Sequence, residues 1–296
     1  MLNDRFGADR DLPITDTAAD PGLFGPDSVT WRVMREPRLI LGGGRALLMQ
    51  AAHPMVAQGA IDHSTYATDP WGRLNRTMEW VTRVCFGTTA EAVRATEFIN
   101  RLHTRVKGSL PAAHTTARIG TGKRYTAMSP KLLLWVHASF VETMLVSHDA
   151  FVGGLTDTDR DTFVREWHAV ARLLGVPQSL LWEDAAAMRH YVAAQVTEGE
   201  VMPGTGSKLV AQTVLRPPLP NVALRPAFAA AAFMTLGLVP PPVRRGYGVL
   251  WTPAHATTHR ALSAWMRSER AIPKRLLETP VYDFALARAR GELSTA

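Results

Sequence analysis

The sequence has a single cysteine, Cys85, among its 296 residues. One thiol cannot form an intrachain disulfide, and zinc sites built from several cysteines are excluded for the same reason. Such sparing use of cysteine is typical of proteins in a reducing compartment, so we expect a cytoplasmic location.

No apolar run is long enough to cross a bilayer. The longest, AFAAAAFMTLGLV at 227–239, is followed by prolines and predicts a buried core helix. Residues 1–24 include neither the apolar stretch nor the cleavage site of a signal peptide, and we expect a partly ordered arm there. Peripheral contact with a membrane stays open because PPVRRGYGVLW, at 241–251, mixes basic and aromatic side chains, but a surface loop with a tucked aromatic side chain is the favoured interpretation.

The net charge of +7 is not concentrated in any basic run, since the 33 lysines and arginines are scattered along the chain. No recognisable nucleic-acid-binding module accompanies this charge, so a nucleic-acid partner is not expected. The phosphate-binding and hydrolase signatures are also missing. GGGR at 42–45 and GTGKR at 120–124 do not complete a Walker A motif, and no Gly-x-Ser-x-Gly elbow occurs.

Helix signals, in contrast, recur along the whole chain, and 46% of the residues are hydrophobic. Asp69 and Pro70 are typical of a helix start, and Thr88 with Glu91 forms a capping box at the start of the next helix. No alternating strand pattern interrupts these segments. We therefore predict one large all-α domain over residues 25–296, with its longest non-helical segment at 111–125. The expected helices cover about 44–60, 71–86, 88–108, 129–149, 158–175, 182–196, 225–237, 254–271 and 280–291.

The segment SPKLLLWVHASFVETMLVSHD, at 129–149, places His137 in one of the most apolar helices of the chain. Helical spacing gives the histidine an apolar face made by Leu133, Leu134, Phe140, Val141, Met144 and Leu145. Two interpretations follow. His137 is a neutral core histidine with both ring nitrogens hydrogen-bonded, or it is a neutral imidazole that ligates haem iron in a dry pocket.

Three further histidines bear on this choice. His103 lies on the inward stripe of its helix, and His53 precedes Pro54 inside an apolar helix that the proline should kink. His63 follows soon after. A four-histidine non-haem metal site is conceivable, but the spacings match neither His-Glu-x-x-His nor Glu-x-x-His. His53, His103 and His137 are therefore the candidate cofactor-binding residues, and both interpretations of His137 stay open at this point.

Several motifs in one order give the chain a resemblance to a known family. They are GGGRALLMQAAHPMVAQGAIDHS, PWGRLNRTMEWVTRVCFGTTAEA, HTRVKG, YTAMSPKLLLWVHASFVETML and ARLLGVP, spread over roughly residues 25–250. The combination resembles the MpaB-type oxygenase family, which includes the rubber oxygenases called latex-clearing proteins. This resemblance implies a helical fold with a globin-like core that holds a b-type haem. It also implies that the histidine of WVHASFV, His137, is the proximal iron ligand.

The rubber oxygenases also carry an Arg-x-x-Lys-Thr motif over the distal face of the haem. RLNRT stands in its place here, which makes Arg73, Arg76 and Thr77 the candidate catalytic residues on one face of a helix. An arginine cannot deprotonate and ligate iron as a lysine can, so the sixth position should be open or occupied by water. Arg76 could steady dioxygen or a haem propionate, while an exposed basic helix face remains the alternative.

The acidic residue that assists chemistry in the rubber enzymes has no equivalent upstream of RLNRT, where Gln50, Gln58 and Asp62 occur instead. The resemblance implies a haem b-dependent oxygenase or dioxygenase that acts with dioxygen on C=C bonds of an apolar terpenoid or lipid-like substrate. The missing acid favours the alternative of a non-catalytic haem or lipid carrier with the same fold. A helical protein without any cofactor is the third hypothesis.

Overall fold

The computed structural model describes residues 12–219, 221–268 and 280–293, and it confirms the all-α prediction. Helices supply nearly all of the regular structure in these ranges, and the strands described there form one short hairpin. No helix within these ranges is both long and apolar enough to cross a membrane.

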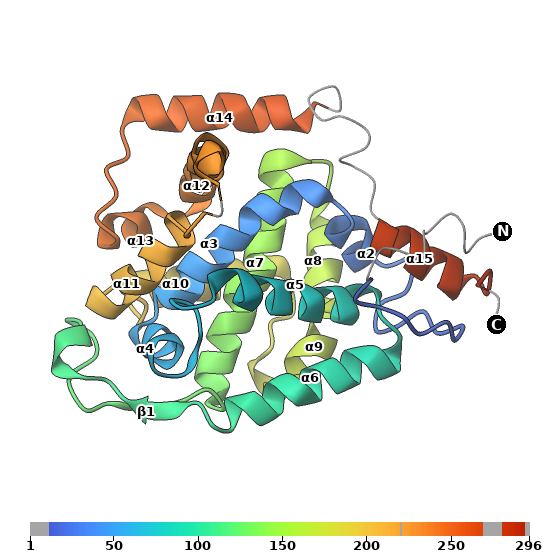
Figure 1. Cartoon of the computed structure of the whole chain (residues 1–296), viewed down its shortest axis with the longest axis horizontal. Coiled ribbons are helices and arrows are strands. Elements are labelled where there is room, and N and C mark those ends of the chain that lie inside the picture. The colour runs from blue at the N-terminus through green and yellow to red at the C-terminus, as the bar shows by residue number, and fades with distance from the viewer. Residues whose placement is uncertain (1–11, 220, 269–279, 294–296) are drawn as a thin grey trace.

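The long helix α7 (Pro130–Phe151) is the centre of the fold, and α3 (Ile40–Ala51) packs along it (Figure 1). Glycines at the start of α3 make this close approach possible. A Cβ on Gly42 would overlap the Ser147 hydroxyl of α7, and one on Gly44 would press against Thr235. The GGGR motif therefore serves helix packing, since only glycine leaves room for these side chains.

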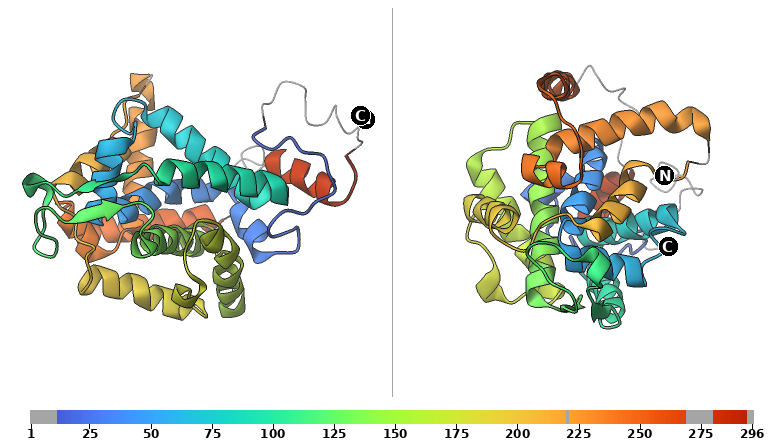
Figure 2. Two further views of the ribbon diagram at one scale, coloured as in Figure 1. Left: turned by 90° about the horizontal axis from the view of Figure 1, so that it is seen from below. Right: turned by 90° about the vertical axis from the view of Figure 1, so that its left-hand side faces the viewer.

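Two groups of helices enclose α7 and α3 (Figure 2). On one side lie α8 (Asp157–Glu166), α9 (His168–Leu173) and α10 (Ala185–Thr197), and on the other lie α5 (Pro70–Phe86) and α6 (Thr89–His103). The Asp69 cap and the Thr88–Glu91 capping box begin α5 and α6 as predicted. Large buried side chains fill the interior, among them Trp31, Trp135, Trp167, Phe151 and Phe163.

The two ends of the described chain meet beside α5. Helix α2 (Val29–Met34) and helix α15 (Pro280–Ala289) both contact α5, and the rings of Trp31 and Tyr282 lie 5.6 Å apart. Ahead of α2, Ile14 is buried and the Thr15 amide donates to Glu91. Residues 1–11 of the predicted arm lie outside the described ranges.

The segment between α6 and α7 contains the hairpin, which the sequence did not predict. Strand β1 (Lys107–Ser109) pairs antiparallel with β2 (Arg124–Thr126), and a short 3-10 helix, η2 (Ala112–His114), lies between them. Strands of three residues are too short to show an alternating pattern. Between them, Arg118 donates to the backbone carbonyls of residues 196, 197, 199 and 201 at the end of α10.

Two predicted helices are divided in the structure. The kink expected at Pro54 is a complete break: α3 ends at Ala51 and α4 (Pro54–His63) starts anew with His53 as its N-cap. The segment 158–175 likewise forms α8 and α9, with Trp167 between them. At Pro54 the ring has no N–H to donate, so the helix restarts where a side chain can cap it.

The C-terminal helices correct a further expectation. They are α11 (Thr205–Leu215), α12 (Arg225–Leu238), α13 (Pro241–Gly246) and α14 (Pro253–Arg267), with short 3-10 turns η1 (Pro37–Leu39), η3 (Gln178–Leu180) and η4 (Val222–Leu224) elsewhere. The prediction of a buried core helix at 227–239 is wrong, because only Met234 and Thr235 are buried within α12. Its alanine-rich first half extends from the body of the molecule (Figure 2). Residues 241–246 are helical rather than part of a loop.

Candidate functional site

His137 lies in the middle of α7 and is only 5% exposed. Its ring centroid is 6.3 Å from those of Trp167 and Trp182, and the Trp182 ring is nearly parallel to it. Burial, helped by the nearby His168, lowers the pKa of His137 to about 3. The imidazole is therefore neutral at physiological pH, which is the form that binds a metal.

No described residue forms a hydrogen bond with either ring nitrogen of His137. The structure therefore lacks the two hydrogen bonds expected if His137 were a core histidine with both ring nitrogens bonded. The ring nitrogens of His137 are not among the fully enclosed side-chain atoms that lack a partner, so water or a bound group can reach them. A role as the ligand of a bound group fits both the neutral state of the His137 ring and its apolar surroundings.

Buried polar atoms without partners lie on α9, which contacts α7, and on α6, which contacts α9. Trp167 Nε1 and His168 Nε2 belong to the start of α9, and Asn100 Oδ1 and His103 Nδ1 to the end of α6. Helices α6 and α9 contact each other, and Asn100 Nδ2 donates to the carbonyl of Leu173. Such unpaired atoms commonly mark the place of water or a bound group.

The other two candidate histidines differ from His137 in their surroundings. His103 is half-buried, and burial lowers its pKa. The Nδ1 atom of His53 accepts from the Met55 amide at 3.3 Å, and its Nε2 lies 3.5 Å from a carboxylate oxygen of Glu200. Burial lowers the pKa of His53 to about 4, against the opposing charge of Glu200. Both ring nitrogens of His53 are thus engaged with the protein.

Arg73, Arg76 and Thr77 lie together in the first half of α5. Arg73 Nε donates to Ser64 Oγ at 2.9 Å, and Thr77 Oγ1 donates to the Arg73 carbonyl. Arg76 is exposed, donates to Thr65 and lies 3.3 Å from a carboxylate oxygen of Asp69. Burial, with Arg76 nearby, lowers the pKa of Arg73. In this structure Arg73 and Arg76 are bound to the segment before α5, and Thr77 bonds back to the backbone of its own helix.

The candidate histidines do not converge on one point. Nowhere in the described ranges do three His, Cys, Asp or Glu side chains come close enough to hold a metal ion. A metal on His137 would therefore take most of its ligands from a prosthetic group, and a porphyrin supplies four nitrogens of its own.

Sequence reasoning missed the residues that surround His137, which are Trp167, His168 and Trp182. They come from the α8–α9 junction and from the segment before α10, so only the packing of these segments against α7 brings them to the site. The one sequence signal that could have pointed to these residues was the adjacent pair Trp167 and His168, because two neighbouring amphipathic rings stand out in the predicted helix at 158–175.

A family model described as ER-bound oxygenase mpaB/B'/Rubber oxygenase, catalytic domain, matches residues 31–268. The chain belongs to this family. The match runs from α2 to the end of α14 and includes both His137 and the Arg73–Thr77 turn. Membership in the mpaB/rubber oxygenase family makes the chain an oxygenase catalytic domain, an oxidoreductase whose reactants are dioxygen and a small molecule. The chain matches no curated protein and no solved structure.

Proposed function

We propose that this mpaB/rubber oxygenase family member is a haem b-dependent oxygenase that acts on the C=C bonds of an apolar terpenoid or lipid-like substrate. The observation that carries the proposal is His137: a buried, neutral imidazole without a hydrogen bond, on the central helix of an oxygenase domain. Residues 25–296 would form the catalytic domain, and the buried thiol of Cys85 suits a protein of the cytoplasm.

His137 would hold the haem iron from the α7 side. When bound, haem supplies the capacity to bind and activate dioxygen. The rings of Trp167 and Trp182 keep water from the imidazole and so favour its neutral form. His168 contributes a second effect, because two neighbouring imidazoles resist the protonation of either one.

Arg73, Arg76 and Thr77 would serve the haem pocket, as the resemblance to the rubber oxygenases implies. Arg73 is held by Ser64, whereas Arg76 is exposed and tied only by surface contacts that contribute little to stability. Arg76 can therefore exchange Asp69 for an anionic or oxygen-bearing partner. An arginine keeps its proton and does not ligate iron, so the oxygen-binding position stays available.

An absorption spectrum tests the ligand assignment. The wild-type protein, expressed with supplementary haem, should show a Soret band that His137→Ala abolishes or shifts. His148→Ala is the matched control, because His148 is also buried on α7 and one of its ring nitrogens also has no partner. A wild-type protein without a Soret band would refute the haem assignment. A band that His137→Ala leaves unchanged would move the ligand to another residue, with His103 and His53 tested next.

Oxygen uptake then separates the oxygenase from a carrier. Haem-loaded protein should consume dioxygen when an unsaturated isoprenoid or fatty acid is added, and should not do so with the saturated analogue. Products cleaved or oxygenated at the double bond, detected by mass spectrometry, would complete the proof. Binding of haem and substrate without uptake would identify a carrier instead.

A further inference from the structure

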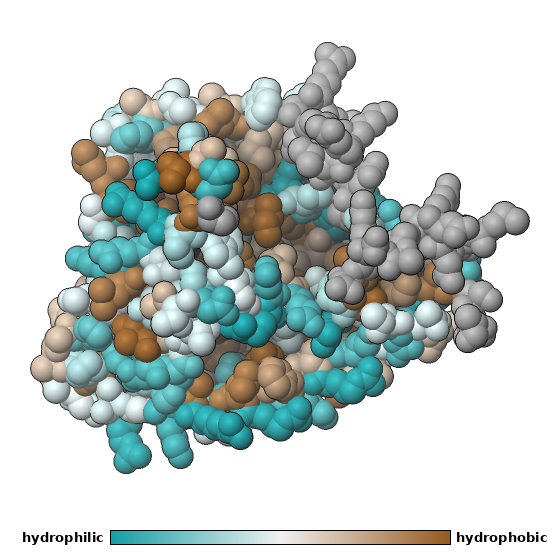
Figure 3. Space-filling view, in the orientation of Figure 1, coloured by the Kyte–Doolittle hydropathy of each residue, from teal (hydrophilic) through white to brown (hydrophobic). Residues whose placement is uncertain are grey.

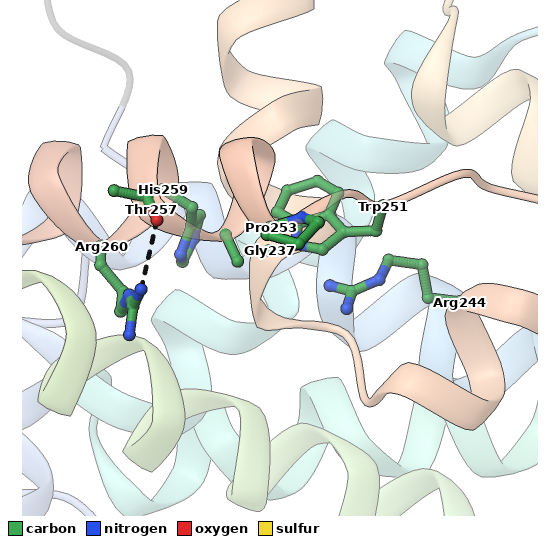
Figure 4. Close-up of a pocket in the computed structure, with 8 residues that line it drawn as sticks. Gly237, Arg244, Trp251, Pro253, Thr257, His259 and Arg260 are labelled. Carbon is green, nitrogen blue, oxygen red and sulfur yellow. Dashed lines mark hydrogen bonds between the residues drawn. The ribbon is translucent and has the colours of Figure 1, made fainter.

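A cavity lies far along the chain from His137, where α12, α13 and α14 meet (Figure 4). It has a volume of about 370 Å³. The lining residues are Gly237, Arg244, Trp251, Pro253, Ala256, Thr257, His259 and Arg260. Two of these side chains are cations and none is a carboxylate.

Arg244 is the unusual member of this lining, since it is only 8% exposed. Its guanidinium carbon lies 4.4 Å from the centre of the Trp251 ring, and Nη1 donates to the Leu236 carbonyl at 2.9 Å. No carboxylate in the described ranges pairs with it, and its Nε and Nη2 have no partner there. The remaining Arg244 donors are not among the enclosed side-chain atoms that lack a partner, so they are open to solvent in the cavity, where an anion can reach them.

The remaining walls support the same inference. Arg260 lies at the other end of the lining from Arg244, where its Nη2 donates to Thr257 at 3.3 Å (Figure 4). His259 is held by Met234, whose carbonyl oxygen lies 3.1 Å from Nε2. Gly237 makes this wall possible, because a Cβ at that position would overlap the His259 ring. The cavity is thus built by close packing of α12 on α14, with two arginines in its lining.

We propose that this cavity binds an oxyanion, a phosphate or carboxylate group, between Arg244 and Arg260. Guanidinium groups recognise such anions through charge-assisted, often bidentate hydrogen bonds. The group could belong to a free metabolite or to a lipid. Leu250, Leu262 and Trp265, which are close in sequence to lining residues, are exposed and would suit the chain of a lipid ligand.

Calorimetric titration with inorganic phosphate at low ionic strength tests the site with the free anion. Arg244→Gln should weaken binding about tenfold or more, because it removes the buried charge and its donors. Arg260→Gln should weaken binding by about threefold to tenfold, and its exposed position keeps the test valid if Arg244→Gln fails to fold. Arg245→Gln is the matched control. It removes the same charge from the neighbouring residue of α13, which is exposed and does not line the cavity.

Sedimentation with vesicles tests the lipid source. Phosphatidylcholine vesicles with and without phosphatidic acid would be compared for wild type and the three variants. Binding of phosphate that depends on Arg244 and Arg260 supports a free anion, and binding only to the acidic vesicles with the same dependence supports a lipid. The proposal is overturned if neither probe binds, or if Arg245→Gln weakens binding as much as the two cavity variants do.

Discussion

Helices α7 and α12 are both strongly apolar, yet only α7 is buried. Most side chains of α7 are enclosed, whereas only Met234 and Thr235 are buried in α12. The surface view shows apolar and polar residues mixed over the part of the molecule that contains α12 (Figure 3). The difference lies in side-chain size. The first half of α12 is mainly alanine, which gains little from burial, while α7 carries leucine, tryptophan and methionine.

This difference separates two kinds of site. The candidate haem ligand His137 lies in the interior that α7 organises, where burial keeps the imidazole neutral. The cavity between Arg244 and Arg260 lies where α12 leaves the body and packs on α14. The proposed haem site would favour uncharged groups and apolar substrates, and the proposed anion site would favour anions.

The largest expected effect comes from Arg45, which holds both helices to α3. It is 1% exposed, lies 2.6 Å from a carboxylate oxygen of Glu142 on α7, and donates to the Leu238 carbonyl on α12. Arg45→Ala would leave the Glu142 carboxylate without its partner and should lower the free energy of unfolding by about 3–5 kcal/mol. Urea unfolding measures the loss. A decrease below about 1 kcal/mol would show that this ion pair does not hold the core.

The next largest effect should be a difference in stability between matched substitutions in α7 and α12. Ala138 of α7 is fully buried, so Ala138→Gln should cost about 3 kcal/mol or more through overpacking and an unpaired amide. Ala230 of α12 is exposed, so Ala230→Gln should change stability by less than about 0.5 kcal/mol. Thermal and urea unfolding of both variants would check this. Equal losses would mean that α12 is covered in solution.

Two adjacent glycines in α3 provide a finer test. Gly42→Ala would press a methyl group against Ser147 of α7 and should destabilise the protein by about 1–3 kcal/mol. Gly43 has no neighbouring atom near its Cβ position, so Gly43→Ala should stabilise the helix by about 0.5–1 kcal/mol. Opposite signs in chemical denaturation are the expected result, and two stabilising substitutions would contradict the close packing of α3 on α7.

The smallest effect concerns pH. The pKa of His53 is about 4 in the folded protein and near 6.5 in an unfolded chain, so the unfolded state binds the extra proton first as the pH falls. Stability should therefore decrease by about 1 kcal/mol between pH 6 and pH 5 through this residue. His53→Asn can still accept a hydrogen bond from the Met55 amide but does not titrate, so its unfolding free energy should depend less on pH. An unchanged pH dependence would contradict the buried, neutral state of His53.

Local signals in the sequence predicted the helices well. The caps at Asp69 and Thr88 depend on neighbouring residues only, and both are present as expected. The break at His53 and the exposure of α12 were missed. A helix boundary at proline depends on whether a cap is available, and the burial of an apolar helix depends on partners that are distant in the chain.

The candidate site shows the same limit. The apolar spacing around His137 predicted its burial, and its ring is buried. The spacing could not reveal Trp182 or His168, which reach the ring from separate segments. Family membership was predictable because it depends on motifs in order along the chain, whereas the roles of His53, His103 and the Arg73–Thr77 turn depend on distances that no motif contains.

The hairpin between α6 and α7 has a practical consequence. Arg118 attaches this segment to the end of α10 through several backbone carbonyls, so its middle is fixed although it contains little regular structure. Its tip differs, because Gly120 and Gly122 are exposed and have open space at their Cβ positions. A cysteine introduced at position 120 would be a convenient point for attaching a fluorophore or a solid support. The single native thiol, Cys85, is buried, so labelling would be confined to the cysteine introduced at position 120.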